Sequence, residues 1–478
     1  MRIDRRKFLA RGAALTGGLA MAGPLQALAA RIALGQEISS AGYGDLQDMG
    51  DLLLPPGFQY KVISKVGDTM SDGNPTPSRF DGMASFSGPE DTTVLIRNHE
   101  NRRRTGAQFS FPSEVDVVVP GDKRYDPTLY NGGVVKLVVD NATRDVIESR
   151  ALLGGTTHNC AGGATPWGSW LTCEELFQTN PTGIRHGYVF EVPASANSPV
   201  QAVPILAAGR FEHEAVAWLD EALYETEDRP NASFYRYTPD VQPGADGDLA
   251  NGGGTLEALV VPALTDQDTR LAGSWPGGVG TAHPVEWVTI PDPNPLGSMD
   301  GPMVTTSVRF QAQERGAAIF ARTEGCWVGD DKIFFDCTTG GGTATDPPNG
   351  FGQIWELDPR ASTLSLIFES ADGELLNSPD NLAVAPTEDL FICEDTGQVP
   401  LPHIRALTPD GQIFDFARAD ANATEFCGAC FSAVARPGGA GAGGLDLSAL
   451  TLYVNQQGNP VQGIPGVLYA IWGPWKRD

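Results

Sequence analysis

The stretch from His158 to Glu175 carries the residue types best suited to chemistry. It begins with Cys160 among small residues and ends on the paired acids Glu174 and Glu175, with an apolar, aromatic run between them that is typical of a strand. Thiolate sulfur suits iron or zinc and carboxylate oxygen suits calcium or iron, so ligands at both ends of one strand unit indicate a metal site. The alternative is a buried cysteine in a glycine-rich turn, with the two acids solvated on a loop.

A recurring unit predicts how this stretch is positioned. A small-residue turn that carries an acid or a cysteine precedes a short apolar strand, a second apolar strand ends in polar or acidic residues, and a third strand follows. Six copies predict an all-β fold, a six-bladed β-propeller, whereas a pair of large β-sandwiches would not explain the recurrence. The copies are aligned at Asp81, Cys160, Glu214, Glu324, Asp380 and Glu425.

Equivalent positions on the innermost strands of a propeller converge on its axis. Five carboxylates and one thiolate in one pocket would repel one another unless cations neutralised them, so the repeat predicts a metal centre on the axis. The numerous oxygen ligands favour calcium, and Cys160 favours a softer ion such as iron. The alternative places the acids in exposed turns. The ends of the second strands add Asn98, Glu100, Glu174, Glu175, Glu227, Asp228, Glu394 and Asp395, although only one of two adjacent acids is expected to face the axis.

Composition and the N-terminus narrow the class of protein. The 478 residues include 57 glycines and 36 prolines, which favours many turns and strands, and a net charge of −26 argues against nucleic acid and anionic membranes as partners. Residues 1–29 read as a twin-arginine signal peptide, with Arg5-Arg6, an apolar stretch too short for a stable membrane span, and a cleavage site before Ala30. We therefore expect export by the twin-arginine machinery, in folded form and with a cofactor already bound, to the periplasm or the medium.

The rest of the chain is expected to form one domain, residues 30–478, with an insertion at about 240–302, and to be a monomer. Seven cysteines leave at least one unpaired, and Cys160 is the best candidate. Cys427 and Cys430 form a C-x-x-C without a second pair, so a zinc ribbon is weakly supported, and Cys326 and Cys337 could form a disulfide or lie in the core. No H-E-x-x-H or G-x-S-x-G motif supports histidine-based or serine-based chemistry.

Motifs across nearly the whole mature chain resemble those of one known family, the PhoX-type alkaline phosphatases, which are exported by the twin-arginine route and fold as six-bladed propellers. The motifs are Arg97-Asn98-His99-Glu100, Asn159-Cys160-Ala161-Gly162-Gly163 continuing to Cys173-Glu174-Glu175, Gly209-Arg210-Phe211 with His213-Glu214-Ala215, Glu227-Asp228, Arg322-Thr323-Glu324-Gly325, Ser378-Pro379-Asp380-Asn381, Cys393-Glu394-Asp395 and Glu425-Phe426.

The resemblance implies hydrolysis of small-molecule phosphate monoesters at a mixed centre of Fe3+ and Ca2+. It implies that Cys160, Glu214 and Glu324 are core ligands, with Cys160 on iron. Arg322 would hold the substrate phosphate, because a planar guanidinium matches phosphate oxygens, and Asn159 is a second candidate for that pocket. The remaining metal-ligand candidates are Glu100, Glu174, Glu175, Glu227, Asp228, Asp380, Glu394 and Asp395.

Two other functions are compatible with the residues. A calcium-dependent propeller lactonase would use acids and asparagine at the axis and would need no thiolate. A non-catalytic, calcium-stabilised propeller would bind partners through the expected insertion. Iron in the purified protein would count against the lactonase, and hydrolysis of a phosphate monoester would count against the binding protein.

Overall fold

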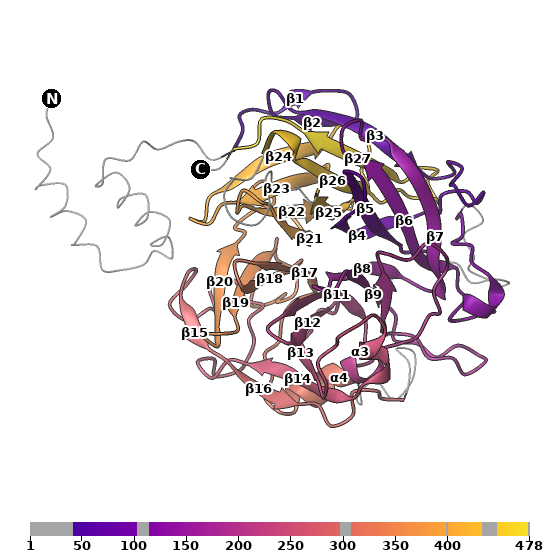
Figure 1. The fold of residues 1–478 in the computed structure, drawn as a ribbon. Coiled ribbons are helices and arrows are strands. Elements are labelled where there is room, and N and C mark those ends of the chain that lie inside the picture. Colours follow the sequence, from indigo (N-terminus) through magenta and orange to yellow (C-terminus); the bar gives the residue numbers. More distant parts are fainter. Residues whose placement is uncertain (1–41, 103–113, 297–306, 398–399, 433–446, 477–478) are drawn as a thin grey trace, which may run out of the picture.

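The computed structural model describes residues 42–102, 114–296, 307–397, 400–432 and 447–476. The expected signal peptide at residues 1–29 lies outside the described residues, as do residues 297–302 of the expected insertion. Within the described parts, the strands form six antiparallel sheets around a common axis, which confirms the predicted six-bladed propeller (Figure 1).

We number the blades in chain order of their innermost strands. Blade 1 contains β4 (Phe80–Ser87), β5 (Thr92–His99), β6 (Gly132–Asp140) and β7 (Val146–Thr156). Blade 2 contains β8 (Asn159–Ala164), β9 (Ser169–Glu174) and β10 (Val189–Pro193). Blade 3 contains β11 (His213–Leu219), β12 (Ala222–Glu227), β13 (Tyr235–Pro239), β14 (Gly254–Val260) and β16 (Glu286–Thr289).

The second half of the ring is built in the same way. Blade 4 contains β17 (Thr323–Gly329), β18 (Lys332–Cys337), β19 (Gln353–Asp358), β20 (Thr363–Glu369) and β15 (Ala282–Pro284). Blade 5 contains β21 (Pro379–Val384), β22 (Leu390–Glu394), β23 (His403–Leu407), β24 (Ile413–Ala419), β2 (Leu52–Leu54) and β1 (Gln47–Asp48). Blade 6 contains β25 (Phe426–Phe431), β26 (Thr451–Gln456), β27 (Val467–Trp472) and β3 (Gln59–Lys65).

Packing between blades explains the continuous apolar runs of the inner strands. Each blade is covered on both faces by its neighbours, so β5, β9, β12, β22, β25 and β26 are buried along their whole length. Trp170 and Phe190 of blade 2, for example, share one core with Ile96 and Leu152 of blade 1. All seven cysteines are buried and free, and Cys326 and Cys337 are core residues.

The ring is closed by strands from opposite ends of the chain. β3 pairs antiparallel with β27 in blade 6, with Ser64 opposite Leu468, and β2 pairs with β24 in blade 5 (Figure 1). Strands from the beginning of the described chain therefore complete blades 5 and 6. Their hydrogen bonds to strands from the end of the chain hold the ring closed.

The segment expected to be an insertion contributes strands to two blades. Within residues 240–296, β14 and β16 extend blade 3 and β15 pairs with β20 of blade 4. Leu256, Ala258 and Leu259 of β14 are buried, so this part of the segment is built into the ring.

Helices are few and short among the described residues. They are α3 (Asp248–Asn251), α4 (Val308–Gln313) and the 3-10 turns η1 (Gly121–Lys123), η2 (Leu206–Ala208) and η4 (Leu447–Ala449). Within the part of the chain that the structure describes, no helix has the length and apolar character needed to cross a membrane.

Candidate metal centre

The strand register defines which side chains are equivalent around the axis. In every blade the last residue of the second strand pairs with a residue at the start of the innermost strand: Phe80 with His99, Asn159 with Glu174, His213 with Glu227, Thr323 with Cys337, Pro379 with Glu394, and Phe426 with Gln456. A β-bulge follows this pair directly in blades 1 to 5, and in blade 6 it follows the next pair, Cys427 with Asn455. Bulges re-aim side chains locally. The residues that follow the inner partners, which we call the axial ring, are Asp81, Cys160, Glu214, Glu324, Asp380 and Cys427.

The electrostatics show that these residues converge. Burial raises the pKa of Glu214 well above its usual range, and the charges of Glu175, Glu324, Asp380 and Asp81, which come from four other blades, raise it further. Charges act on one another in this way only when they lie in the same buried region. The predicted axial positions of blades 1 to 5 are therefore brought together.

The register corrects the prediction for blade 6. Sequence reasoning placed Glu425 at the equivalent position, but Phe426 is the residue that pairs with Gln456, so Cys427 is equivalent to Cys160. Glu425 comes two residues before Cys427 and still lies in the same region, because its pKa is raised by burial and by the charges of Asp395, Asp380 and Asp81. The axial ring thus contains two cysteines.

A second ring is formed by the residues that directly follow the second strands. Each member donates its backbone N–H to a carbonyl oxygen of its own blade, with N to O distances of 2.9–3.2 Å. The accepting residue lies two positions before the axial residue of that blade. Four of those accepting residues, Arg79, His158, Arg322 and Ser378, have φ between 47° and 54°, a strained conformation that recurs at functional sites. The second ring consists of Glu100, Glu175, Asp228, Thr338, Asp395 and Gln457.

Among the residues that the structure describes, three groups of side chains have ligand atoms within 4.8 Å of one another and could each hold a metal ion. The first is Cys160, Glu175 and Glu214, and the second is Asp380, Asp395 and Glu425. The third contains Asp81, Glu425 and Cys427. Each group combines members of both rings or the neighbouring Glu425, as expected for ligands supplied by several blades.

The donor set fits bound cations. Burial, followed by the charges of neighbouring groups, raises the pKa values of Asp81, Glu175 and Asp380 well above the usual range of carboxyl groups. For Glu324 burial also raises the pKa and the charge of Arg322 only partly opposes it. Carboxylates that are buried together and repel one another are stabilised as anions by multivalent cations.

Four predicted site residues are not brought to the axis. The carboxylates of Glu174, Glu227 and Glu394 accept hydrogen bonds from protein groups, among them His186 Nδ1, Tyr235 Oη and Arg405 Nε respectively. Asn159 contacts Thr156 and Thr172 within blade 2. Successive strand residues point to opposite faces, so the neighbours of these four reach the axis in their place. Those neighbours are Glu175, Asp228, Asp395 and Cys160.

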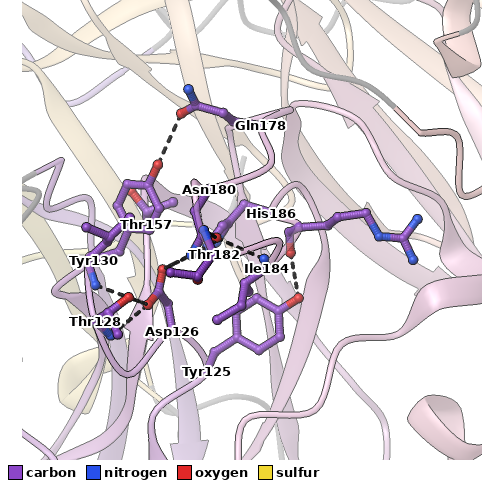
Figure 2. A network of polar contacts seen from close by, with 12 residues as sticks. Tyr125, Asp126, Thr128, Tyr130, Thr157, Gln178, Asn180, Thr182, Ile184 and His186 are labelled. Atoms are coloured by element: carbon purple, nitrogen blue, oxygen red, sulfur yellow. Dashed lines mark hydrogen bonds and ion pairs between the residues drawn. The ribbon is translucent and has the colours of Figure 1, made fainter.

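Glu174, the neighbour of Glu175 in the chain, contacts a buried polar network at His186. Figure 2 shows the part of this network around Asp126, Asn180 and His186. His186 is fully buried, with Nδ1 2.7 Å from Glu174 Oε1 and Nε2 3.6 Å from Asp126 Oδ2. Burial alone would lower the pKa of His186, but the charge of Glu174 and the contact with Asp126 outweigh it and raise the pKa to about 9. Asp126 also accepts hydrogen bonds from Thr128 and from Asn180 Nδ2. The network fastens two loops to the inner end of blade 2.

Two arginines from opposite blades reach the centre. Arg322 contacts Asp228 with Nε at 2.7 Å and Glu324 with Nη2 at 2.6 Å. Arg102, which follows β5 of blade 1, forms an ion pair with Glu100. Burial raises the pKa of Asp395, and the charges of both arginines oppose this rise. Their side chains are 32% and 44% exposed, so both are accessible to a small anion from solvent.

Three residues of the centre were missed by sequence reasoning. Cys427 was assigned only to a weak C-x-x-C motif, and no role was assigned to Gln457, which follows β26, or to Arg102, which begins a basic run. The signal that could have found Gln457 is its place directly after a second strand, which it shares with Glu100 and Glu175.

The comparisons with known proteins agree with this architecture. The family model described as alkaline phosphatase PhoX matches residues 41–151 and 142–458. Among solved structures, the chain is similar to Pseudomonas fluorescens PhoX in complex with vanadate, a transition state analogue, with a TM-score of 0.66 and 17% identity over 90% of this chain and 97% of that chain. At this identity the structural likeness shows the fold.

Two further solved structures are less similar. A putative gluconolactonase has a TM-score of 0.39 and 9% identity over 88% of this chain and 94% of that chain. A calcium structure of a Trichoderma reesei family AA12 enzyme has a TM-score of 0.37 and 11% identity over 80% of this chain and 100% of that chain. Scores this low carry no argument about function. No curated protein matches the chain.

Proposed function

Because this chain belongs to the alkaline phosphatase PhoX family and is therefore a hydrolase of phosphate monoesters, we propose that its two rings hold a mixed centre of Fe3+ and Ca2+. The observation that supports the centre is the convergence of Cys160, Glu175 and Glu214 from two blades, with ligand atoms within 4.8 Å of one another. One thiolate with two carboxylates is a donor set that suits iron.

The other acids would hold calcium. Asp380, Asp395 and Glu425 offer only oxygen, which hard cations such as Ca2+ prefer. Glu324 and Asp228 lie beside Arg322, and Glu100 lies beside Arg102, so these acids join the metal region to its arginines. Glu174, Glu227 and Glu394 are left out of the proposed ligand set because protein groups already occupy their oxygens.

In the proposed mechanism Arg322 binds and orients the substrate phosphate. Asp228 and Glu324 hold the guanidinium of Arg322 at two points. Its remaining N–H groups can therefore bind the phosphate with little further loss of side-chain entropy. Bound metal ions would supply Lewis acidity toward the phosphate oxygens. Arg102 adds positive charge from the opposite blade, where it favours a doubly charged monoester.

Family membership favours this function over the two alternatives, a calcium-dependent lactonase and a non-catalytic calcium-stabilised propeller. We also propose that residues 1–29 direct export by the twin-arginine machinery to the periplasm or the medium, and that the mature protein is a monomer. N-terminal sequencing of exported protein should find Ala30 first, and light scattering should give the mass of one chain.

The centre is tested by elemental analysis of natively exported protein, together with a phosphate monoester assay with and without a calcium chelator. Iron and calcium should both be present, and chelation should abolish turnover. Arg322→Ala should lose turnover and keep its metals. Arg236→Ala is the matched control, because Arg236 pairs with Glu257 on outer strands of blade 3. Full activity of Arg322→Ala would show that the assigned role is wrong.

A further inference from the structure

Blade 6 offers a second thiolate to the centre, and we propose that Cys427 binds a metal ion of its own together with Asp81, Glu425 and Gln457. The ion would be of borderline softness, iron or zinc, because the set combines one thiolate with carboxylate and amide oxygens. This inference rests on the proposed function, since it places the new subsite in the same two rings.

The surroundings of Cys427 repeat those of Cys160. Cys160 Sγ lies 3.2 Å from the carbonyl oxygen of His213, the first residue of the next innermost strand, and 3.9 Å from that of Cys173 in its own blade. Cys427 Sγ lies 3.2 Å from the carbonyl oxygen of Phe80, which also begins the next innermost strand, and 4.0 Å from that of Asn455 in its own blade. The two thiols therefore occupy equivalent places on blades 2 and 6.

The remaining ligands follow the same equivalence. Around Cys160 they are Glu175 of the second ring and Glu214, the axial residue of the next blade. The corresponding residues around Cys427 are Gln457 of the second ring and Asp81 of blade 1. Glu425, which also belongs to the oxygen-only group with Asp380 and Asp395, adds a carboxylate that the two subsites share, and the ligand atoms of Asp81, Glu425 and Cys427 lie within 4.8 Å of one another.

The amide of Gln457 gives an independent indication of a cation. Its Nε2 lies 3.0 Å from Asp81 Oδ2, 3.0 Å from Glu100 Oε2 and 2.6 Å from Glu425 Oε1. An amide nitrogen has two hydrogens, so it cannot serve three carboxylates equally. The oxygen and nitrogen of an amide exchange places by a half-turn, and Gln457 could then offer Oε1 as a ligand where Glu175 offers a carboxylate in blade 2.

The test is the metal content of natively exported protein carrying Cys427→Ser, with Cys430→Ser as the matched control. Cys430 belongs to the same C-x-x-C motif but lies in the apolar core between blades 6 and 1, with Met83 and Leu95. Cys427→Ser should lose about one iron or zinc ion per chain and, where that ion is iron, its thiolate-to-iron absorption, and Cys430→Ser should lose neither. Unchanged metal content and absorption in Cys427→Ser would overturn the inference.

A second variant keeps the test decisive if Cys427→Ser does not fold. Gln457→Leu leaves the thiol intact and removes the amide oxygen, so it should lower retention of the same ion during dialysis against a chelator. Retention equal to that of the wild type would overturn the inference. Absence of both iron and zinc from the wild-type protein would instead refute the proposed centre. If Cys160→Ser loses iron but Cys427→Ser keeps all of its metal, the proposed centre stands and only the role of Cys427 is refuted.

Discussion

The substitution His186→Gln tests whether a buried charge fastens the loops behind the second ring. His186 is held between Glu174, at 2.7 Å, and Asp126, at 3.6 Å, and its pKa is raised to about 9. Glutamine keeps an amide that can donate a hydrogen bond to Glu174, but it cannot carry the positive charge. The variant therefore removes the charge with little change in side-chain volume.

The size and sign of the effect follow from proton linkage. In the unfolded chain His186 has an ordinary pKa of about 6.5, below its value of about 9 in the folded protein, so the contribution to stability is complete below pH 6.5 and is lost as pH rises through 9. The gap between the two pKa values, at about 1.4 kcal/mol for each pH unit, corresponds to about 3 kcal/mol.

Denaturant unfolding of both proteins from pH 6 to pH 10 measures this contribution. Buried thiols also release protons on unfolding at high pH, so the informative quantity is the difference in unfolding free energy between wild type and variant. The difference should be about 3 kcal/mol at pH 6, should fall between pH 6.5 and pH 9, and should be nearly gone at pH 10. His283→Gln is the control, because it makes the same substitution at a histidine whose Nε2 lies 2.6 Å from the carbonyl oxygen of Pro276. A wild-type-to-variant difference that does not change with pH would refute the reasoning.

Two further predictions concern the centre itself. Gly82→Ala should destabilise the protein by about 1–3 kcal/mol, because a Cβ atom there would lie 2.4 Å from Ala161 Cα and 2.8 Å from the Cys160 carbonyl oxygen. Thermal unfolding of this variant should show a lower midpoint. Gly121→Ala is the control and should leave the midpoint unchanged, because a Cβ atom there would meet nothing within 4 Å. Equal midpoints would show that blades 1 and 2 can separate there. Arg102→Gln should raise KM for a phosphate monoester by at least about tenfold with unchanged metal content, since a charge-assisted hydrogen bond contributes about 1.5–3 kcal/mol and each 1.4 kcal/mol is about tenfold; an unchanged KM would exclude contact with the phosphate.

Much of the fold could be predicted from the sequence because the repeat is local. Asp81, Glu214 and Glu324 each stand second in an inner strand, so an alignment of the strand starts was enough to group them as axial positions. The alternation of strand side chains also predicted that only one of two adjacent acids faces the axis, as Glu174 and Glu175 show.

The error at Glu425 and Cys427 has a different cause. The register of β25 is fixed by its pairing with β26, whose residues lie about 25 positions further along the chain, and a single sequence does not reveal which residues face each other. An acid near the strand start was therefore taken as the equivalent of the other acids. Arg102 was missed because ion pairing with Glu100 turns a residue of a basic run toward the centre.

The closure of blade 6 by β3 and β27 sets an order on assembly. This blade supplies Cys427 and Gln457, so the two rings are incomplete until the last strand has been synthesised and has paired with one of the first. A chain truncated before β25 would lack these residues, and contacts so distant in sequence form late in folding. A metal that binds only the closed ring would stabilise only the completed molecule. A bound metal would therefore mark a protein in which all six blades have formed before it leaves its site of synthesis.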